Sequence, residues 1–223
     1  MSVWNQPCYG QYICIASGRP ERQQGGIILK NKKVHKLVGV ALLIAIMIVL
    51  QFLGTILPIK IGPVSISLVL IPIVIGAAVY GPGAGAILGA AFGILANIFC
   101  ANGMDGGGHM VFQASPILCI VVVMLKGILC GYAAGWVYKL LSKKNGYVAM
   151  ICAAIVCPVV NTGIFLLAMR LFFMDVLSVW ANGSNVAGYV LTGIVLVNFL
   201  PELALNVAVS PASQRIIHVV NKK

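Results

Sequence analysis

The chain has 223 residues, of which 61% are hydrophobic and only 9% are charged, and its mean hydropathy is +1.03. This composition excludes an ordinary soluble globular domain, in which about a quarter of the residues are charged. The formal net charge of +11 does not require a nucleic-acid partner, because basic residues gathered on one side of a membrane protein account for it.

Residues 1–28 are predicted to be a disordered or misassigned N-terminal extension. The segment is polar, contains Pro, Arg and Gln, and has no apolar core of a signal peptide. Gly25 and Gly26 can be encoded by a sequence that contains a ribosome-binding core, and Leu29 by TTG, a bacterial start codon. Both interpretations stay open: a disordered tail, or a protein whose translation begins at Leu29.

Residues 29–223 are predicted to form one all-α integral membrane protein domain, a compact bundle of six transmembrane helices. A bilayer core about 30 Å thick needs roughly 20 apolar residues per helix, and the turn-forming Gly81-Pro82 separates the second run from the third. The apolar runs do not alternate with period two, which argues against an outer-membrane barrel. The predicted spans are residues 37–56, 64–80, 83–99, 116–141, 148–173 and 186–209.

Basic residues indicate which side of the membrane holds the termini. Lysine and arginine in short loops stay in the cytoplasm. Clusters precede the first span, lie between the fourth and fifth, and follow the sixth, whereas Lys60, Asp105 and Asp175 lie on the opposite side. The N and C termini are therefore predicted to be cytoplasmic. The clustered residues are Lys30, Lys32, Lys33, Lys36, Lys139, Lys143, Lys144, Arg215, Lys222 and Lys223.

Glycine recurs every four residues in the third and fourth spans. The stretch "YGPGAGAILGAAFG", which begins at Tyr80, lacks the preceding strand and the Lys-Ser/Thr pair of a phosphate-binding loop. A four-residue spacing instead places the glycines on one helix face, where a neighbouring helix can approach closely. The sequence therefore predicts tight helix packing at Gly81, Gly85, Gly89, Gly93, Gly127, Gly131 and Gly135.

Ionisable side chains inside the spans are candidates for function, because each costs at least about 2.5 kcal/mol near the bilayer centre. Lys126 and Glu202 lie at similar expected depths, so they could form a buried ion pair. Alternatively, Lys126 snorkels or meets a substrate anion. Arg170 is placed to meet an anion that enters from outside, or to act as an interfacial anchor.

Amide side chains in the spans are a second group of candidates. Each could hydrogen-bond a ligand or a neighbouring helix, and the sequence does not decide between the two. These residues are Asn97, Asn161, Asn198 and Asn206.

Two outer loops complete the candidates. The loop from Cys100 to Gln113 is rich in glycine, which is typical of a flexible lid, and it carries Asp105 and His109. No metal site is expected, because one Asp and one His rarely suffice without further ligands. Trp180 in the later loop could stack on a ring or belong to an interfacial aromatic belt.

No catalytic constellation emerges, so an enzyme is disfavoured and no cofactor is expected. Of the three histidines, His35 and His218 lie at cytoplasmic ends, far from His109, and no nucleophile with a positioned base is apparent. The seven cysteines are mostly isolated and several lie inside spans, which is typical of small packing residues and not of a disulfide framework.

Three segments resemble the substrate-binding S components of energy-coupling factor (ECF) transporters. They are "LPIKIGPVSISLVLIPIVIGAAVYGPGAGAILGAAFG" from Leu57, "PVVNTGIF" from Pro158 and "NFLPELALNVAVSPA" from Asn198. The similarity covers roughly residues 33–223, and the Pro-Gly run between the second and third spans is its most specific part.

The resemblance implies partners and a location. In this family, a small protein of the bacterial plasma membrane captures a vitamin or related micronutrient from outside. It delivers the solute by toppling when docked on a transmembrane coupling subunit driven by two ATPase subunits. The family's A-A-x-x-x-A contact motif reads V-A-L-L-I-A from Val40 here, so Ala41 and Ala45 are retained and the first alanine is replaced by valine.

The resemblance also implies a ligand pocket in the outer half of the bundle, with Glu202 orienting Lys126 from the inner half. The cations Lys60, Lys126 and Arg170 favour a carboxylate or phosphate substrate such as pantothenate or folate. The implied substrate-binding residues are Asn97, Asp105, His109, Gln113, Lys126, Asn161, Arg170, Trp180 and Asn198.

The predicted function is therefore the capture subunit of an ECF-type importer for a small, anionic solute. One alternative is a self-sufficient, proton-coupled secondary transporter in which Glu202 or Asp105 carries the proton, although no inverted repeat is evident. A second alternative is a membrane assembly or sensor protein without transport.

Overall fold

The computed structural model describes residues 32–56, 68–183 and 185–221, and within these ranges the regular structure is helical throughout. The all-α class is therefore confirmed. The predicted extension over residues 1–28, the start at Leu29 and the position of Lys60 lie outside the described residues.

The helices follow one another with short connections. Pro82 and Pro116 occupy first helical positions, where a missing N–H removes no helical hydrogen bond. Asn145 caps the helix that follows it, because its Oδ1 accepts from the backbone N–H groups of Tyr147 and Val148 at 3.0 and 3.4 Å. The described elements are α1 (Lys32–Ile56), α2 (Leu70–Tyr80), α3 (Pro82–Ala101), α4 (Gly106–Ala114), α5 (Pro116–Leu141), α6 (Gly146–Phe172), α7 (Met174–Ala181), α8 (Val186–Tyr189), the π-helix η1 (Val190–Phe199) and α9 (Leu200–Asn221).

Five stretches of helix in the described part are long and apolar enough to cross a membrane. Four lie within α1, α3, α5 and α6, and the fifth is the rod of α8, η1 and α9 over Val186–Arg215. The predicted second span, residues 64–80, is represented by the 11-residue α2, which is about 16 Å long and too short to cross a bilayer alone. Residues 57–67 of this region lie outside the described residues.

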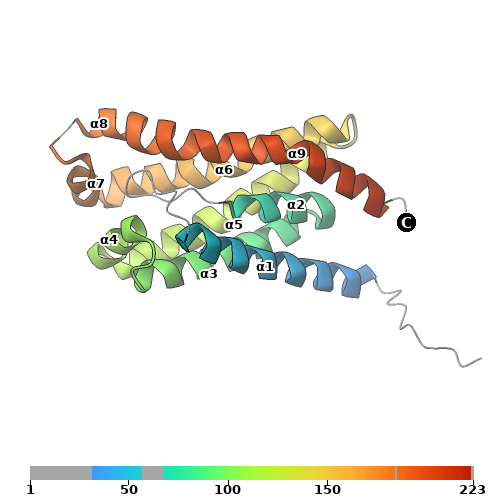
Figure 1. The fold of residues 1–223 in the computed structure, drawn as a ribbon, viewed down its shortest axis with the longest axis horizontal. Coiled ribbons are helices and arrows are strands. Elements are labelled where there is room, and N and C mark those ends of the chain that lie inside the picture. Colours follow the sequence, from blue (N-terminus) through green and yellow to red (C-terminus); the bar gives the residue numbers. More distant parts are fainter. Residues whose placement is uncertain (1–31, 57–67, 184, 222–223) are drawn as a thin grey trace, which may run out of the picture.

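The long helices run side by side, and the connecting elements gather at one end (Figure 1). The start of α1 and the end of α9 lie at the right-hand end of the view. The short helices α4, α7 and α8 lie at the left-hand end. Both described ends of the chain therefore lie at the same end of the bundle.

Glycine allows α3 and α5 to pack with their backbones in contact. A Cβ atom built on Gly89 would meet the carbonyl oxygen of Gly127 and lie 2.6 Å from its carbonyl carbon. A Cβ atom on Gly85 would meet the carbonyl oxygen of Gly131, and one on Gly135 would lie 2.7 Å from the Cα atom of Pro82. The predicted close approach is thus confirmed, and the two glycine-rich helices face each other.

Gly81 has a different role from the one its spacing predicted. It precedes α3 instead of lying on the helix face, and a Cβ atom there would meet nothing within 4 Å. Its φ of 89° lies in the region that glycine tolerates best. Gly81 therefore makes the tight turn from α2 into α3.

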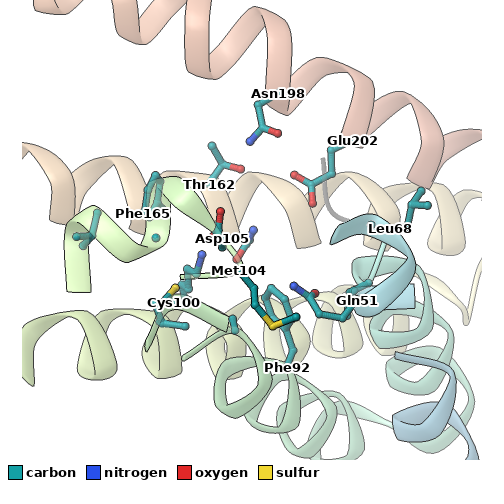
Figure 2. Close-up of a pocket in the computed structure, with 18 of the residues that line it drawn as sticks. Gln51, Leu68, Phe92, Cys100, Met104, Asp105, Thr162, Phe165, Asn198 and Glu202 are labelled. Carbon is teal, nitrogen blue, oxygen red and sulfur yellow. The ribbon is translucent and has the colours of Figure 1, made fainter. Parts of the chain in front are cut away.

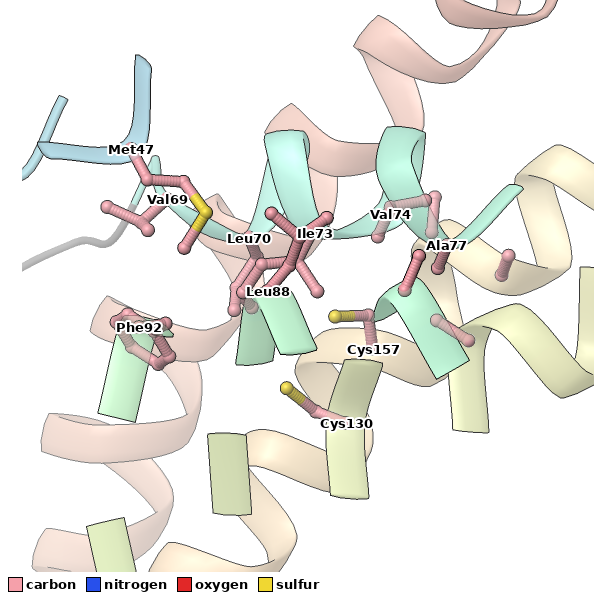
Figure 3. Close-up of a cluster of buried hydrophobic side chains, with 14 of the residues drawn as sticks. Met47, Val69, Leu70, Ile73, Val74, Ala77, Leu88, Phe92, Cys130 and Cys157 are labelled. Atoms are coloured by element: carbon pink, nitrogen blue, oxygen red, sulfur yellow. The ribbon is translucent and has the colours of Figure 1, made fainter. Parts of the chain in front are cut away.

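One apolar cluster fills the half of the bundle around α2 (Figure 3). Leu70, Ile73 and Leu88 are fully buried there, and Cys130 of α5 and Cys157 of α6 lie among them. The five described cysteines are free thiols, and four of them are buried, as expected for small packing residues. A second cluster, which includes Phe173, lies by α4 and α7.

Candidate functional site

A cavity of about 130 Å³ lies in the half of the bundle next to α4 and α7 (Figure 2). The ends of α1, α3 and α6, the start of α5, and parts of η1 and α9 contribute to its wall. It lies between the two apolar clusters, because Val69 and Phe92 of the first and Val123 and Ile194 of the second line it. The packing of both clusters therefore fixes the shape of the cavity.

Four helical segments line the cavity with residues that are mostly spaced by three or four. In an α-helix, this spacing places residues one above another on a single face. These residues are Phe92, Ala96 and Cys100 on α3, Cys119, Val123 and Lys126 on α5, Asn161, Thr162 and Phe165 on α6, and Ile194, Asn198 and Glu202 on η1 and α9.

Lys126 brings a cation to the cavity wall. Its Nζ lies 4.9 Å from the centre of the Phe165 ring and 6.0 Å from that of Phe92, distances at which an ammonium is attracted by the ring face. Two aromatic rings therefore hold the ammonium beside the space that a ligand would occupy.

Three buried residues with unpartnered oxygen atoms share the cavity wall with Lys126. Asn161 and Asn198 are each 7% exposed and Glu202 is 3% exposed. Asn161 Oδ1, Asn198 Oδ1 and Glu202 Oε1 have no hydrogen-bond partner. Leaving such groups unpaired costs about 1–3 kcal/mol each, so the wall is suited to a molecule that supplies donors.

Lys126 and Glu202 do not form the direct ion pair that their depths allowed. In the described part of the chain, no nitrogen–oxygen contact within 4.0 Å joins them. Both residues line the same cavity instead. The contact of Lys126 with a substrate anion therefore stays a prediction.

The helix that carries Asn198 is π-helical over Val190–Phe199. A ten-residue π-helical stretch is unusual, because π-helices mostly occur as single-turn bulges, frequently at functional sites. Ile194 and Asn198 of this π-helix line the cavity. Glu202, near the start of α9 and four residues after Asn198, lines it as well. Sequence periodicity does not reveal this change of register.

The end of the cavity next to α4 and α7 is formed by Asp105 and Trp180. Asp105 precedes α4 and lines the cavity together with Met104 and Gly108. Trp180 of α7 also lines the cavity, and its Nε1–H donates to Met110 Sδ at 3.3 Å. The predicted lid segment thus contributes both a short helix and a cavity-lining acid.

Three of the predicted site residues have local partners and do not line the cavity. His109 Nδ1 lies 2.8 Å from the Cys100 carbonyl oxygen, so this nitrogen carries the proton and donates. His109 Nε2 then accepts from Gln113 Nε2 at 2.9 Å. Asn97 Nδ2 donates to the Gly93 carbonyl oxygen at 2.9 Å. These bonds hold α4 to α3 and tie Asn97 to its own helix.

Arg170 lies near the end of α6 that is next to α7, and its side chain is exposed. It is not among the residues that line the cavity. Its contact with an entering anion stays a prediction, as does its alternative role as an interfacial anchor.

A comparison with protein families matches residues 35–213 to the model of the ECF transporter substrate-specific component. The chain belongs to this family. The resemblance that the Pro-Gly run and the asparagine motifs indicated is therefore confirmed. A comparison of the sequence with curated proteins gave no match.

Membership of the family defines the general role of the chain. ECF S components are substrate-binding proteins of transporters and are not enzymes, and they act with the components of an ECF module on a small-molecule substrate. Together with the long apolar helices, this makes the chain a multi-pass membrane protein of transport.

The cavity of this S component is also lined by residues that no sequence pattern had indicated. Gln51, Phe92, Met104, Thr162 and Phe165 all line it. Phe165 could have been found from its spacing, because it lies one helical turn after Asn161. Gln51 and Met104 carry no such signal, since they reach the cavity only through the way α1 and the turn before α4 pack.

Proposed function

We propose that this S component is the substrate-capture subunit of an ECF importer in a bacterial plasma membrane, and that it binds a small solute with an anionic group. The observation that carries the proposal is the cavity in which Lys126, Asn161, Asn198 and Glu202 meet three aromatic side chains. Pockets for small molecules combine such an apolar wall with a few convergent polar groups.

We further propose that the chain crosses the membrane six times, with both termini in the cytoplasm. Support comes from the start of α1 and the end of α9, which lie at the same end of the bundle (Figure 1). Further support comes from three lysines at the end of α5: Lys139 lies in its last turn, and Lys143 and Lys144 follow it. Basic residues in short loops are retained on the cytoplasmic side. With this orientation, the cavity lies in the outer half of the bilayer, near α4 and α7.

Cysteine labelling tests this orientation. In intact cells, a membrane-impermeant maleimide should label Ser178→Cys in α7 but should label Lys143→Cys only after lysis. Both positions are exposed and both lie outside the cavity wall. Labelling of the unsubstituted chain measures the contribution of its native cysteines. Labelling of Lys143→Cys in intact cells, or protection of Ser178→Cys there, would contradict the proposed orientation.

The exposed face of α1 suits the coupling subunit. Ala41 and Ala45 are one turn apart and both are exposed, and they lie among large exposed apolar residues such as Leu42 and Val49. Small side chains let two helices approach closely within a membrane. We propose that a helix of the coupling subunit packs over Ala41 and Ala45, and that two ATPase subunits energise the complex.

Substitution of these alanines tests the contact. The tagged chain, co-expressed with a coupling subunit and its two ATPases, should recover the complete complex, whereas Ala41→Trp with Ala45→Trp should recover little of it. Leu167→Trp on α6 is the matched control, because Leu167 is also an apolar residue on the outside of the bundle, 63% exposed. This variant should leave recovery of the complex unchanged. Full recovery with the double variant would refute the proposed contact.

A proton-coupled secondary transporter is the second candidate, because the buried acid Glu202 and Asp105 both line the cavity. Native mass spectrometry of gently purified protein would identify the bound solute. Its uptake is then measured in cells with and without active ATPase subunits. The capture function predicts accumulation only with active ATPases. Accumulation without them would support the secondary transporter.

A further inference from the structure

We propose that the cavity selects an amphoteric solute of about one ring, which carries hydrogen-bond donors on one side and an anionic group on the other. This inference rests on the proposed capture function and specifies its substrate class. It is argued from the two unlike walls of the cavity, the acceptor wall (Asn161, Asn198 and Glu202) and the cationic wall (Lys126 with Phe92 and Phe165).

The acceptor wall presents three buried oxygen atoms that have no hydrogen-bond partner. Glu202 is a carboxyl group at 3% exposure whose Oε1 has no hydrogen-bond partner, and Asn198 lies one turn before it with its side chain directed to the same space (Figure 2). Asn161 on the facing helix α6 adds a third unpartnered oxygen. A buried polar oxygen is costly when no donor reaches it, and no protein group among the described residues donates a hydrogen bond to Oε1.

The two asparagines adapt to a ligand more readily than Glu202 does. An amide can turn to present either oxygen or nitrogen, whereas a carboxyl group offers oxygen atoms that accept hydrogen bonds, and Glu202 Oε1 has no partner for this. A hydrogen-bond donor on the ligand suits this wall, and an aminated nitrogen heterocycle is a compact example.

The cationic wall lies apart from Glu202. Lys126 Nζ is 4.9 Å from the Phe165 ring centre, and Phe165 and Glu202 are well separated across the cavity in Figure 2. An ammonium is best matched by a carboxylate or another anion. Lys126 and Glu202 are not in direct contact, so each can contact a different end of the ligand.

The size of the cavity and its aromatic lining favour a single ring. Its volume of about 130 Å³ is close to that of the engineered 150 Å³ cavity that binds benzene. Phe92, Phe165 and Trp180 supply flat apolar surface for such a ring. A larger solute would require Met104 or Gln51 to move from the wall.

Three matched probes test the inference on the purified full chain. They are 6-aminopyridine-3-carboxylate, which has both groups, pyridine-3-carboxylate, which lacks the amino donor, and 2-aminopyridine, which lacks the anion. Binding is measured by calorimetry with wild type, with E202Q, and with D175N, which removes an exposed acid outside the cavity as a matched control. We expect wild type to bind the first probe at least tenfold more tightly than either of the others.

The variants then separate the two walls. E202Q should weaken 6-aminopyridine-3-carboxylate at least tenfold and change pyridine-3-carboxylate less than threefold, whereas D175N should change neither. Thermal unfolding without probe checks that E202Q is folded, and Asn198→Asp provides a second variant, which should strengthen binding of 2-aminopyridine. Equal affinities for the three probes, no binding of any, or an unchanged preference in E202Q would overturn the inference.

Failure of the inference remains distinguishable from failure of the capture function. If ATP-dependent uptake is found for a solute without donor groups, the amphoteric class is wrong and the capture function stands. If the chain neither assembles with an ECF coupling subunit nor supports ATP-dependent uptake, the capture function itself fails.

Discussion

Replacing Lys126 by alanine is expected to lower the affinity for an anionic solute by about 2 kcal/mol or more, which is about thirtyfold or more, because a hydrogen bond to a charged group contributes about 1.5–3 kcal/mol. The ammonium lies beside the Phe165 and Phe92 rings at the cavity wall. Alanine removes the charge and also empties space next to both rings. The measurement is calorimetric titration with the solute that co-purifies with the wild type.

Two further variants identify the cause of that loss. Lys126→Met keeps most of the volume of the side chain and removes the charge, so it should lose about as much affinity as Lys126→Ala. Lys139→Ala removes an exposed lysine from the last turn of the same helix and should bind like the wild type. If Lys126→Met retained full affinity, the role of Lys126 would be packing, and the cationic wall would be refuted.

Replacing Gly89 by alanine is expected to lower the free energy of unfolding by about 1–3 kcal/mol, the usual cost of forcing extra volume into a packed interior. The added Cβ atom would meet the Gly127 carbonyl oxygen and lie 2.6 Å from its carbonyl carbon and 3.2 Å from Ile128 Cα. These are backbone atoms of α5, so the two helices themselves must separate. Reversible unfolding in mixed micelles measures the change.

Gly83→Ala is the matched control, because it lies in the first turn of the same helix and its Cβ atom would meet nothing within 4 Å. It should be neutral or stabilising by up to about 1 kcal/mol, since alanine favours helix more than glycine does. Equal effects of the two substitutions would show that the α3–α5 contact does not determine stability.

Gly89→Ala should also weaken solute binding. Beyond Gly89, α3 carries Phe92 and Cys100 to the cavity, and α5 carries Lys126 immediately before Gly127. The glycine contact therefore sets the separation between two walls of the site. A displacement of α3 from α5 moves Phe92 away from the Lys126 ammonium.

Much of the fold could be predicted because membrane helices follow directly from apolar length. The predicted fourth span, residues 116–141, coincides with the helix Pro116–Leu141, since Pro116 begins it and polar residues follow it. The predicted second span, residues 64–80, is only partly described, and its described helix begins at Leu70. Hydropathy measures whether a segment is apolar and does not give the residue at which a helix begins.

The site was less predictable, because polar residues in a membrane segment have the same sequence signal whether they bind a ligand or a neighbour. Asn161 and Asn198 line the cavity, while Asn97 bonds to its own helix at Gly93. Asn206 similarly donates to the Glu202 carbonyl oxygen at 2.9 Å. Their environments differ only through helix rotation, which depends on contacts with other helices.

The sequence by itself determined that this protein is a helical membrane protein, that it belongs to the S components, and that glycine faces bring helices together. These properties depend on composition and on spacing along one helix. Only the tertiary structure decided that Lys126 and Glu202 face one cavity without pairing, and that a π-helical turn brings Asn198 there. Those relations join separate helices, and their physical origin is the packing of these helices against one another, which no single segment specifies.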